Sequence, residues 1–186
     1  ALDIGAQDWN MEPPAVIGQA IVRRNHIDDV GVCGIAGMAV QDTLIESNLI
    51  EHVGYQDVEL AWETGGIKLH LSKNCLLRGN VIRHIIHAEA IWLDYENTNT
   101  RVTGNVMGDT LDTLRGGIYL EASHDSNMID NNIIWKATEG KGGGSYSMPA
   151  HGGWGITVDG SDETVIAHNL IGVTQDAAIK LSLIHI

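Results

Sequence analysis

The stretch AIWLDYENTNTRVTGNVMGD (residues 90–109) is followed by a near copy of itself, GIYLEASHDSNMIDNNII (residues 117–134). Each copy opens with a short strand in which apolar and other residues alternate. An asparagine that precedes two apolar residues stands 14 positions after the first isoleucine, from Ile91 to Asn105 and from Ile118 to Asn132. Alternation with a period of two is typical of β-strands, so the repeating unit is built from strands and tight bends.

The same unit recurs on both sides of this pair, although unequal loops hide it. Variants of Gly/Ala-Ile-x-Leu/Val-x occur as GIAGM (34–38), GIKLH (66–70), GITVD (155–159) and AIKLS (178–182). Successive isoleucines at the head of the unit, from Ile35 to Ile179, lie 32, 24, 27, 38 and 23 residues apart. The core of the repeat is therefore about 23 residues long, and the additions fall between one asparagine segment and the next isoleucine strand.

Short strands, a constant coil length and variation in one loop predict an all-β fold, a right-handed parallel β-helix of about 6–7 coils. The recurrent asparagine predicts a ladder of stacked amides at a bend where the asparagine itself adopts the left-handed conformation. An α-solenoid is excluded, because the apolar spacing is two rather than three to four and β-branched residues dominate.

Composition limits the classes of function. The 186 residues are 44% hydrophobic, which suffices for one domain with a core. A formal net charge of −13 argues against a nucleic-acid partner, and the absence of a run of 18 apolar residues argues against a membrane span. Cys33 and Cys75 are expected to be buried thiols. Oligomeric state and compartment stay open.

The two ends of the sequence lead to one further expectation. Residues 1–186 are predicted to form a single β-helix domain that is truncated at both ends, because the chain opens within a repeat and closes just after the strand unit AIKLS. The final LSLIHI (residues 181–186) is interpreted as a tail that is at least partly non-native.

Equivalent outward positions of a β-helix stack about 4.8 Å apart, so the repeat predicts which side chains form lines along one face. The outward residue after the Leu/Val of each unit is acidic in the middle coils, and the outward residue after the Ile is aromatic in two of them. These lines run His70–Asp94–Glu121–Asp159 and Lys68–Trp92–Tyr119–Thr157.

Stacked carboxylates raise the pKa of at least one member, which places a protonated acid beside an ionised base. Carboxyl groups on adjacent coils match the separation of about 5–5.5 Å used by retaining glycoside hydrolases. Trp92 and Tyr119 would offer faces on which a sugar ring stacks. A solvated acidic surface and a structural Ca²⁺ site are the alternative interpretations of the line; no other cofactor is expected.

Residues 90–109 and 116–134 resemble the catalytic coils of glycoside hydrolase family 120, retaining β-xylosidases built on a right-handed β-helix. The resemblance lies in the Trp-Leu-Asp strand, the Thr-Arg-Val that follows, and the Leu-Glu-x-x-His of the next coil. It implies that Asp94 is the nucleophile, that Glu121 is the general acid/base, and that His70 lies in the sugar-binding subsite.

The remaining candidates lie near these two lines. His124 follows Glu121 by three residues and is a candidate to orient an acid or a sugar hydroxyl. The loops that enter the acidic strands contribute candidate wall residues, and the Gly-rich loop 139–154 is interpreted as a lip over a ligand. The predicted substrate-binding set is His70, Trp92, Tyr119, Asp159, His124 and Lys68, and the wall candidates are His87, Glu89, Arg115, Tyr146, His151 and Trp154.

The sequence thus predicts a retaining glycoside hydrolase that acts on xylo-oligosaccharides or related β-glycosides. One rival is a β-helix polysaccharide lyase or epimerase, for which Lys68, His70 or Tyr119 would serve as base. The other rival is a non-catalytic, glycan-binding β-helix of the tailspike or adhesin kind. An oligosaccharide is the expected partner in each case.

Overall fold

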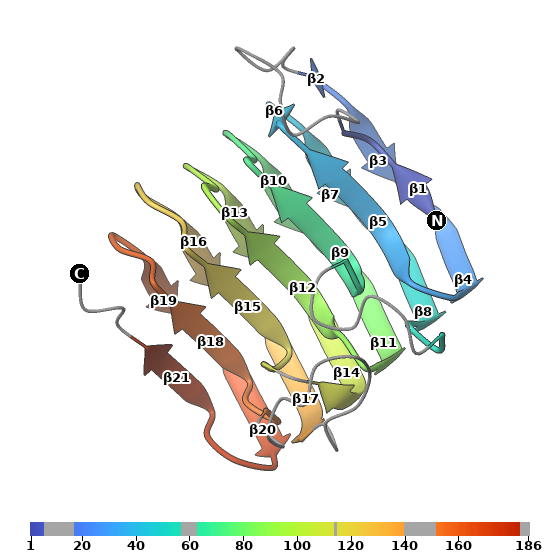
Figure 1. The fold of residues 1–186 in the computed structure, drawn as a ribbon, viewed down its shortest axis with the longest axis vertical. Helices are drawn as coiled ribbons and strands as arrows, with labels where there is room; N and C mark the ends of the chain where they lie inside the picture. Colours follow the sequence, from blue (N-terminus) through green and yellow to red (C-terminus); the bar gives the residue numbers. More distant parts are fainter. Residues whose placement is uncertain (6–16, 57–62, 114, 140–151, 183–186) are drawn as a thin grey trace.

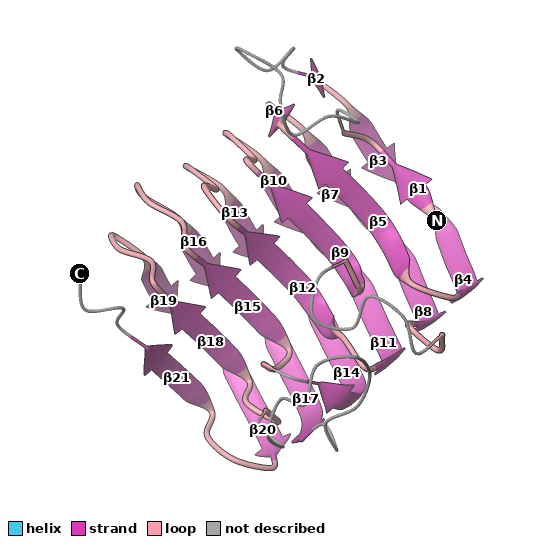
Figure 2. Cartoon of the chain, in the orientation of Figure 1, coloured by secondary structure: helices cyan, strands magenta, loops and turns pink. Residues whose placement is uncertain are grey.

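The chain forms a stack of parallel strands with no helix among the residues that the structure describes (Figures 1 and 2). The computed structural model describes residues 1–5, 17–56, 63–113, 115–139 and 152–182. Three parallel sheets run along the stack, and a two-stranded sheet, β2–β6, adds to them. The fold is the predicted parallel β-helix, and its right-handed path follows the general rule for crossovers between parallel strands.

The strands of each sheet lie in chain order along the helix. The first sheet holds β1 (Leu2–Asp3), β5 (Cys33–Met38), β9 (Gly65–His70), β12 (Glu89–Asp94), β15 (Ile118–Glu121), β18 (Ile156–Asp159) and β21 (Ile179–Ser182). The second holds β3 (Ile21–Arg23), β7 (Leu44–Glu46), β10 (Leu76–Arg78), β13 (Arg101–Thr103), β16 (Met128–Asp130) and β19 (Val165–Ala167). The third holds β4 (His26–Val30), β8 (Leu49–Val53), β11 (Val81–Ile86), β14 (Val106–Thr113), β17 (Ile133–Glu139) and β20 (Leu170–Thr174), and the short pair is β2 (Ile17–Gly18) with β6 (Val40–Gln41).

The core is a stack of identical side-chain positions, as the repeat predicts. Ile67 lies opposite Ile91, and Ile91 opposite Ile118, in consecutive strands of the first sheet. All three are completely buried. Because each coil covers the apolar face of the next, burial of the isoleucine fixes the register of these strands of the first sheet.

The asparagine ladder is confirmed, but its backbone differs from the prediction. Each side-chain amide donates to the amide oxygen of the next coil over 2.9–3.0 Å, along Asn25, Asn48, Asn80, Asn105, Asn132 and Asn169. The left-handed conformation falls on the residue before the asparagine, with φ of 54° at Ser47 and 61° at Gly79. The bend needs one such residue, and placing it one position earlier lets the asparagine side chain point into the stack.

The insertions lie where the repeat places them, between a strand of the third sheet and the next strand of the first. The two longest insertions connect β8 to β9 and β17 to β18. Cys33 and Cys75 are free and buried, as predicted. Nothing among the described residues is a helix of the length and apolar character that a membrane crossing requires.

Candidate active site

The two predicted lines of side chains form on the first sheet. In the register of β12 and β15, Asp94 lies opposite Glu121 and Trp92 opposite Tyr119. The neighbouring strands extend the lines, with His70 of β9 opposite Asp94 and Asp159 of β18 opposite Glu121. Figure 1 shows these four strands side by side in the middle of the stack. The juxtaposition follows from the constant core of the repeat, although 27 residues separate the two acids in sequence.

The line Lys68–Trp92–Tyr119–Thr157 is buried, although its side chains point away from the isoleucine core. Lys68, Trp92, Tyr119 and Thr157 are each no more than 2% exposed. The ring centroids of Trp92 and Tyr119 lie 5.5 Å apart at a tilt of 40°. The Lys68 ammonium lies 3.4 Å from the centre of the Trp92 ring, a cation–π contact. The face of Trp92 that a sugar was expected to use is therefore covered by a cation.

Asp94 contacts two basic side chains, both from β9. The Lys68 Nζ is 3.1 Å from Asp94 Oδ2, and His70 Nδ1 is 3.4 Å from the same oxygen. Glu63, from the loop before β9, contacts both bases, at 3.7 Å from Lys68 Nζ and 3.4 Å from His70 Nε2. Because Lys68 is buried and Asp94 is only 18% exposed, their attraction is weakly screened by solvent.

Glu121 lies in a different environment from Asp94. The Trp92 Nε1–H donates to Glu121 Oε2 over 3.2 Å. Burial raises the pKa of Glu121, and the Asp94 carboxylate raises it further. Arg115 and a hydrogen bond with Tyr119 act in the opposite direction without cancelling the rise. Glu121 therefore keeps its proton to a higher pH than an ordinary glutamate does.

Glu89 and Arg115, predicted as residues of a cleft wall, contact each other, and Arg115 also lies over the rings of Trp92 and Tyr119. Glu89 is completely buried, and its Oε1 accepts from the backbone N–H of Arg115 over 3.0 Å and from the Thr113 hydroxyl over 3.3 Å. Burial raises the pKa of Glu89. The Arg115 guanidinium lies 4.9 Å from the ring centres of both Trp92 and Tyr119. Glu89 Oε2 and Arg115 Nη1 are buried without a hydrogen-bond partner among the described residues.

The other predicted residues lie away from the acid pair or outside the described residues. His124 is half exposed, with Nδ1 3.3 Å from Asp162 Oδ1. Trp154 donates from Nε1 to Asp176 over 2.7 Å, and Lys180 covers its ring. Tyr146, His151 and most of the loop 139–154 lie outside the described residues.

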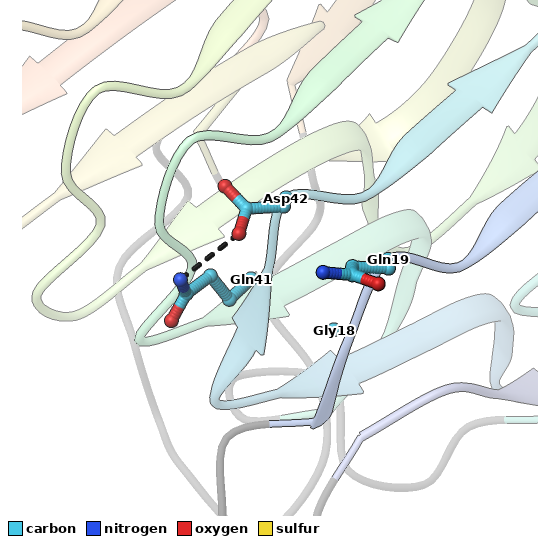
Figure 3. A pocket seen from close by; sticks show the side chains of 4 residues that line it. All are labelled: Gly18, Gln19, Gln41 and Asp42. Carbon is cyan, nitrogen blue, oxygen red and sulfur yellow. Dashed lines mark hydrogen bonds between the residues drawn. The ribbon is translucent and has the colours of Figure 1, made fainter.

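A pocket of about 310 Å³ lies elsewhere, on the β2–β6 pair (Figure 3). Gly18, Gln19, Gln41 and Asp42 line it, and Gln41 Nε2 donates to Asp42 Oδ2 over 2.9 Å. Asp42 also accepts from Asn74, and these hydrogen bonds lower its pKa. A single ionised carboxyl group among amides offers no acid/base pair, so this pocket is the weaker candidate for chemistry.

Comparison with known proteins supports the β-helix fold. The model of the family described as NosD, periplasmic copper-binding protein, matches residues 18–183. A solved structure, the complex of XylC with xylose, is similar with a TM-score of 0.56 and 22% sequence identity. The similarity covers 80% of this chain and 21% of the other, so this chain spans about a fifth of that protein. No curated protein sequence matches the chain.

Proposed function

The chain belongs to the NosD family, and on this β-helix we propose a retaining glycoside hydrolase site for xylo-oligosaccharides or related β-glycosides. Asp94 is the nucleophile and Glu121 the general acid/base in this proposal. The observation that carries it is the direct pairing of Asp94 with Glu121 on adjacent strands, with the pKa of Glu121 raised.

Two features of the pair support a double displacement. Neighbouring parallel strands lie about 4.8 Å apart, and retaining enzymes hold their two carboxyl groups about 5–5.5 Å apart. The two acids also have unlike surroundings, since Lys68 contacts Asp94 while burial and Asp94 itself favour the neutral form of Glu121. One group is suited to attack and the other to donate a proton.

In the proposed reaction the Asp94 carboxylate attacks the anomeric carbon while Glu121 gives its proton to the departing glycosidic oxygen. The glycosyl–Asp94 ester is then hydrolysed by water, whose proton returns to Glu121. His70 and Lys68 hold the Asp94 carboxylate in place, and Trp92 donates to Glu121.

The test is the anomer that is released. We expect hydrolysis of one or more members of a panel of nitrophenyl β-glycosides, with β-xyloside among them, and NMR of early time points should show the β-anomer first. Release of the α-anomer would contradict a retaining mechanism. A product that absorbs through a new carbon–carbon double bond would indicate a lyase, and saturable sugar binding without turnover would indicate a glycan-binding protein.

The lyase rival would use Lys68, His70 or Tyr119 as its base. Burial and the Glu121 carboxylate raise the pKa of Tyr119 well above its ordinary value, so its hydroxyl holds its proton at neutral pH. Lys68 is engaged by Asp94 and by the ring of Trp92. Neither Lys68 nor Tyr119 is prepared to abstract a proton, which leaves His70, in contact with Asp94 and Glu63, as the base that a lyase would need.

The pH dependence of the reaction gives a separate prediction for Glu121. A general acid works while it keeps its proton, so activity is lost as pH rises through its pKa. Because the folded protein raises this pKa, the alkaline limb of kcat/KM is expected above the ordinary glutamate value of about 4.3. Glu121→Gln should abolish this limb and lower kcat/KM on xylobiose about 100-fold or more.

Leaving groups distinguish proton donation from a structural effect. A nitrophenolate departs with little help, so the first step with a nitrophenyl xyloside should suffer much less in Glu121→Gln than the same step with xylobiose. Glu163→Gln, at an exposed position, is the matched control and should leave both profiles unchanged. Equal losses on both substrates would be incompatible with the role given to Glu121.

The family description names copper, so we ask which side chains of this chain could bind it. Cys33 and Cys75 do not form a thiolate site, since each is buried and donates to backbone carbonyls, Cys33 to Ile35 and Cys75 to Val40. Imidazole and carboxylate donors, which suit Cu²⁺, converge instead on the third sheet at His26, Asp28 and Glu51. No step of the proposed hydrolysis passes through a metal ion.

A further inference from the structure

The outer face of β4 and β8 carries a cluster of ligand atoms that the proposed hydrolysis does not use. His26, Asp28 and Glu51 each place one ligand atom within 4.8 Å of the others. The strand register causes this convergence, since His26 and Asp28 alternate onto one face of β4 and Glu51 lies opposite Asp28 on β8. We propose that these three residues bind a divalent transition-metal ion.

Both carboxylates are held in place by a second neighbour, as ligands of a metal usually are. Arg83 Nε donates to Glu51 Oε2 over 2.7 Å, which leaves Oε1 facing His26 Nε2 at 2.8 Å. His52 Nδ1 lies 2.7 Å from Asp28 Oδ1. The outer residues therefore orient the carboxylates, and the strands keep the three ligands at a fixed spacing.

The backbone explains how His52 reaches this face. Asp29 and His52 have positive φ, 56° and 51°, at equivalent places in β4 and β8. His52 contacts Asp28 from this left-handed position, and its ring stacks on that of His84 with centroids 5.0 Å apart and planes 5° apart. His52 is thus anchored from the next coil and is a positioning residue, not a ligand.

Charge and access also fit a cation. Asp28 and Glu51 bring two negative charges, of which the Arg83 guanidinium offsets one. The side chains of His26 and Asp28 are 55% and 44% exposed, which opens the cluster to an ion from solvent.

The donor set selects the class of ion. Ca²⁺ and Mg²⁺ prefer sites made wholly of oxygen, whereas an imidazole nitrogen with two carboxylates suits Cu²⁺ or Zn²⁺. Three protein ligands leave room for water, and so for exchange of the bound ion.

The experiment titrates metal-depleted protein with Cu²⁺ and, separately, Zn²⁺ against a competing chelator. One equivalent should bind, and the Cu²⁺ spectrum in electron paramagnetic resonance should show coupling to one imidazole nitrogen. His26→Ala should weaken binding at least about tenfold and remove that coupling, and Glu51→Gln should weaken it similarly. A tenfold excess of Ca²⁺ should not displace the bound ion.

His168→Ala is the matched control, because His168 is exposed on the turn between β19 and β20 near the other end of the stack. This variant should bind the metal ion with the same affinity as the unaltered chain. Thermal unfolding with chelator present checks that each variant is folded. Equal affinity of the His26→Ala variant and the unaltered chain would overturn the proposal, as would the lack of saturable binding below about 1 mM. Neither outcome bears on Asp94 and Glu121.

Discussion

Asp94→Asn is expected to lower kcat/KM for a nitrophenyl β-xyloside by at least about a thousand-fold. The amide has nearly the shape of the carboxylate but cannot form the glycosyl ester on which the double displacement depends. Initial rates across substrate concentrations measure the loss. The variant should remain folded by circular dichroism, because Asp94 lies at the outer face of the sheet and the isoleucine stack beneath it is unchanged.

Two further variants make this result specific to a nucleophile. Asp125→Asn removes an exposed carboxylate on the loop after β15 and should leave turnover unchanged. In Asp94→Gly, added azide should restore turnover and yield a glycosyl azide of inverted configuration, since azide attacks from the side that Asp94 occupied. Near-normal turnover of Asp94→Asn, or rescue that gives only the free sugar, would refute the role of Asp94.

Asn105→Ala should cause the largest loss of stability, about 3–5 kcal/mol in the free energy of unfolding. The buried Asn105 amide donates to Leu77 O and Asn132 Oδ1, each over 3.0 Å. Its Oδ1 accepts from the backbone N–H and the side-chain amide of Asn80, each over 2.9 Å. Alanine removes these four hydrogen bonds from a buried position, although Asn132 Oδ1 still accepts from the Asn105 backbone N–H and the Asn80 amide still donates to Ile45 O. Urea denaturation measures the result.

The ladder contains its own control. Asn25 stands at one end, is exposed, and donates only to Asn48 Oδ1, through its backbone N–H and its side-chain amide. Water can replace these bonds, so Asn25→Ala should cost about 1 kcal/mol. Similar losses at Asn25 and Asn105 would show that the ladder does not act as a buried network.

The repeat alone was sufficient to predict the pairing of Asp94 with Glu121 and of Trp92 with Tyr119. The reason is that a β-helix has one core length per coil, and that insertions at one corner leave the register of the other strands unchanged. Burial of the isoleucines then fixes which side chains of the first sheet point outward. The glycosidase role of those residues remains a prediction that the proposed variants test.

The surroundings of that pair could not be predicted from the repeat. Lys68 and Arg115 cover the aromatic rings, and Glu89 is buried against Arg115, through contacts made once and not in every coil. These contacts depend on loops of unequal length, for which the sequence has no period to reveal the spacing.

The sequence by itself therefore determined the fold, the register and the line of acids, because all three follow from a period. Only the tertiary structure decided that Trp92 is buried beneath a cation, and that the left-handed residue precedes each ladder asparagine. It also decided that His26, Asp28 and Glu51 converge. These features depend on side-chain packing and backbone bends between coils, which a one-dimensional pattern does not encode.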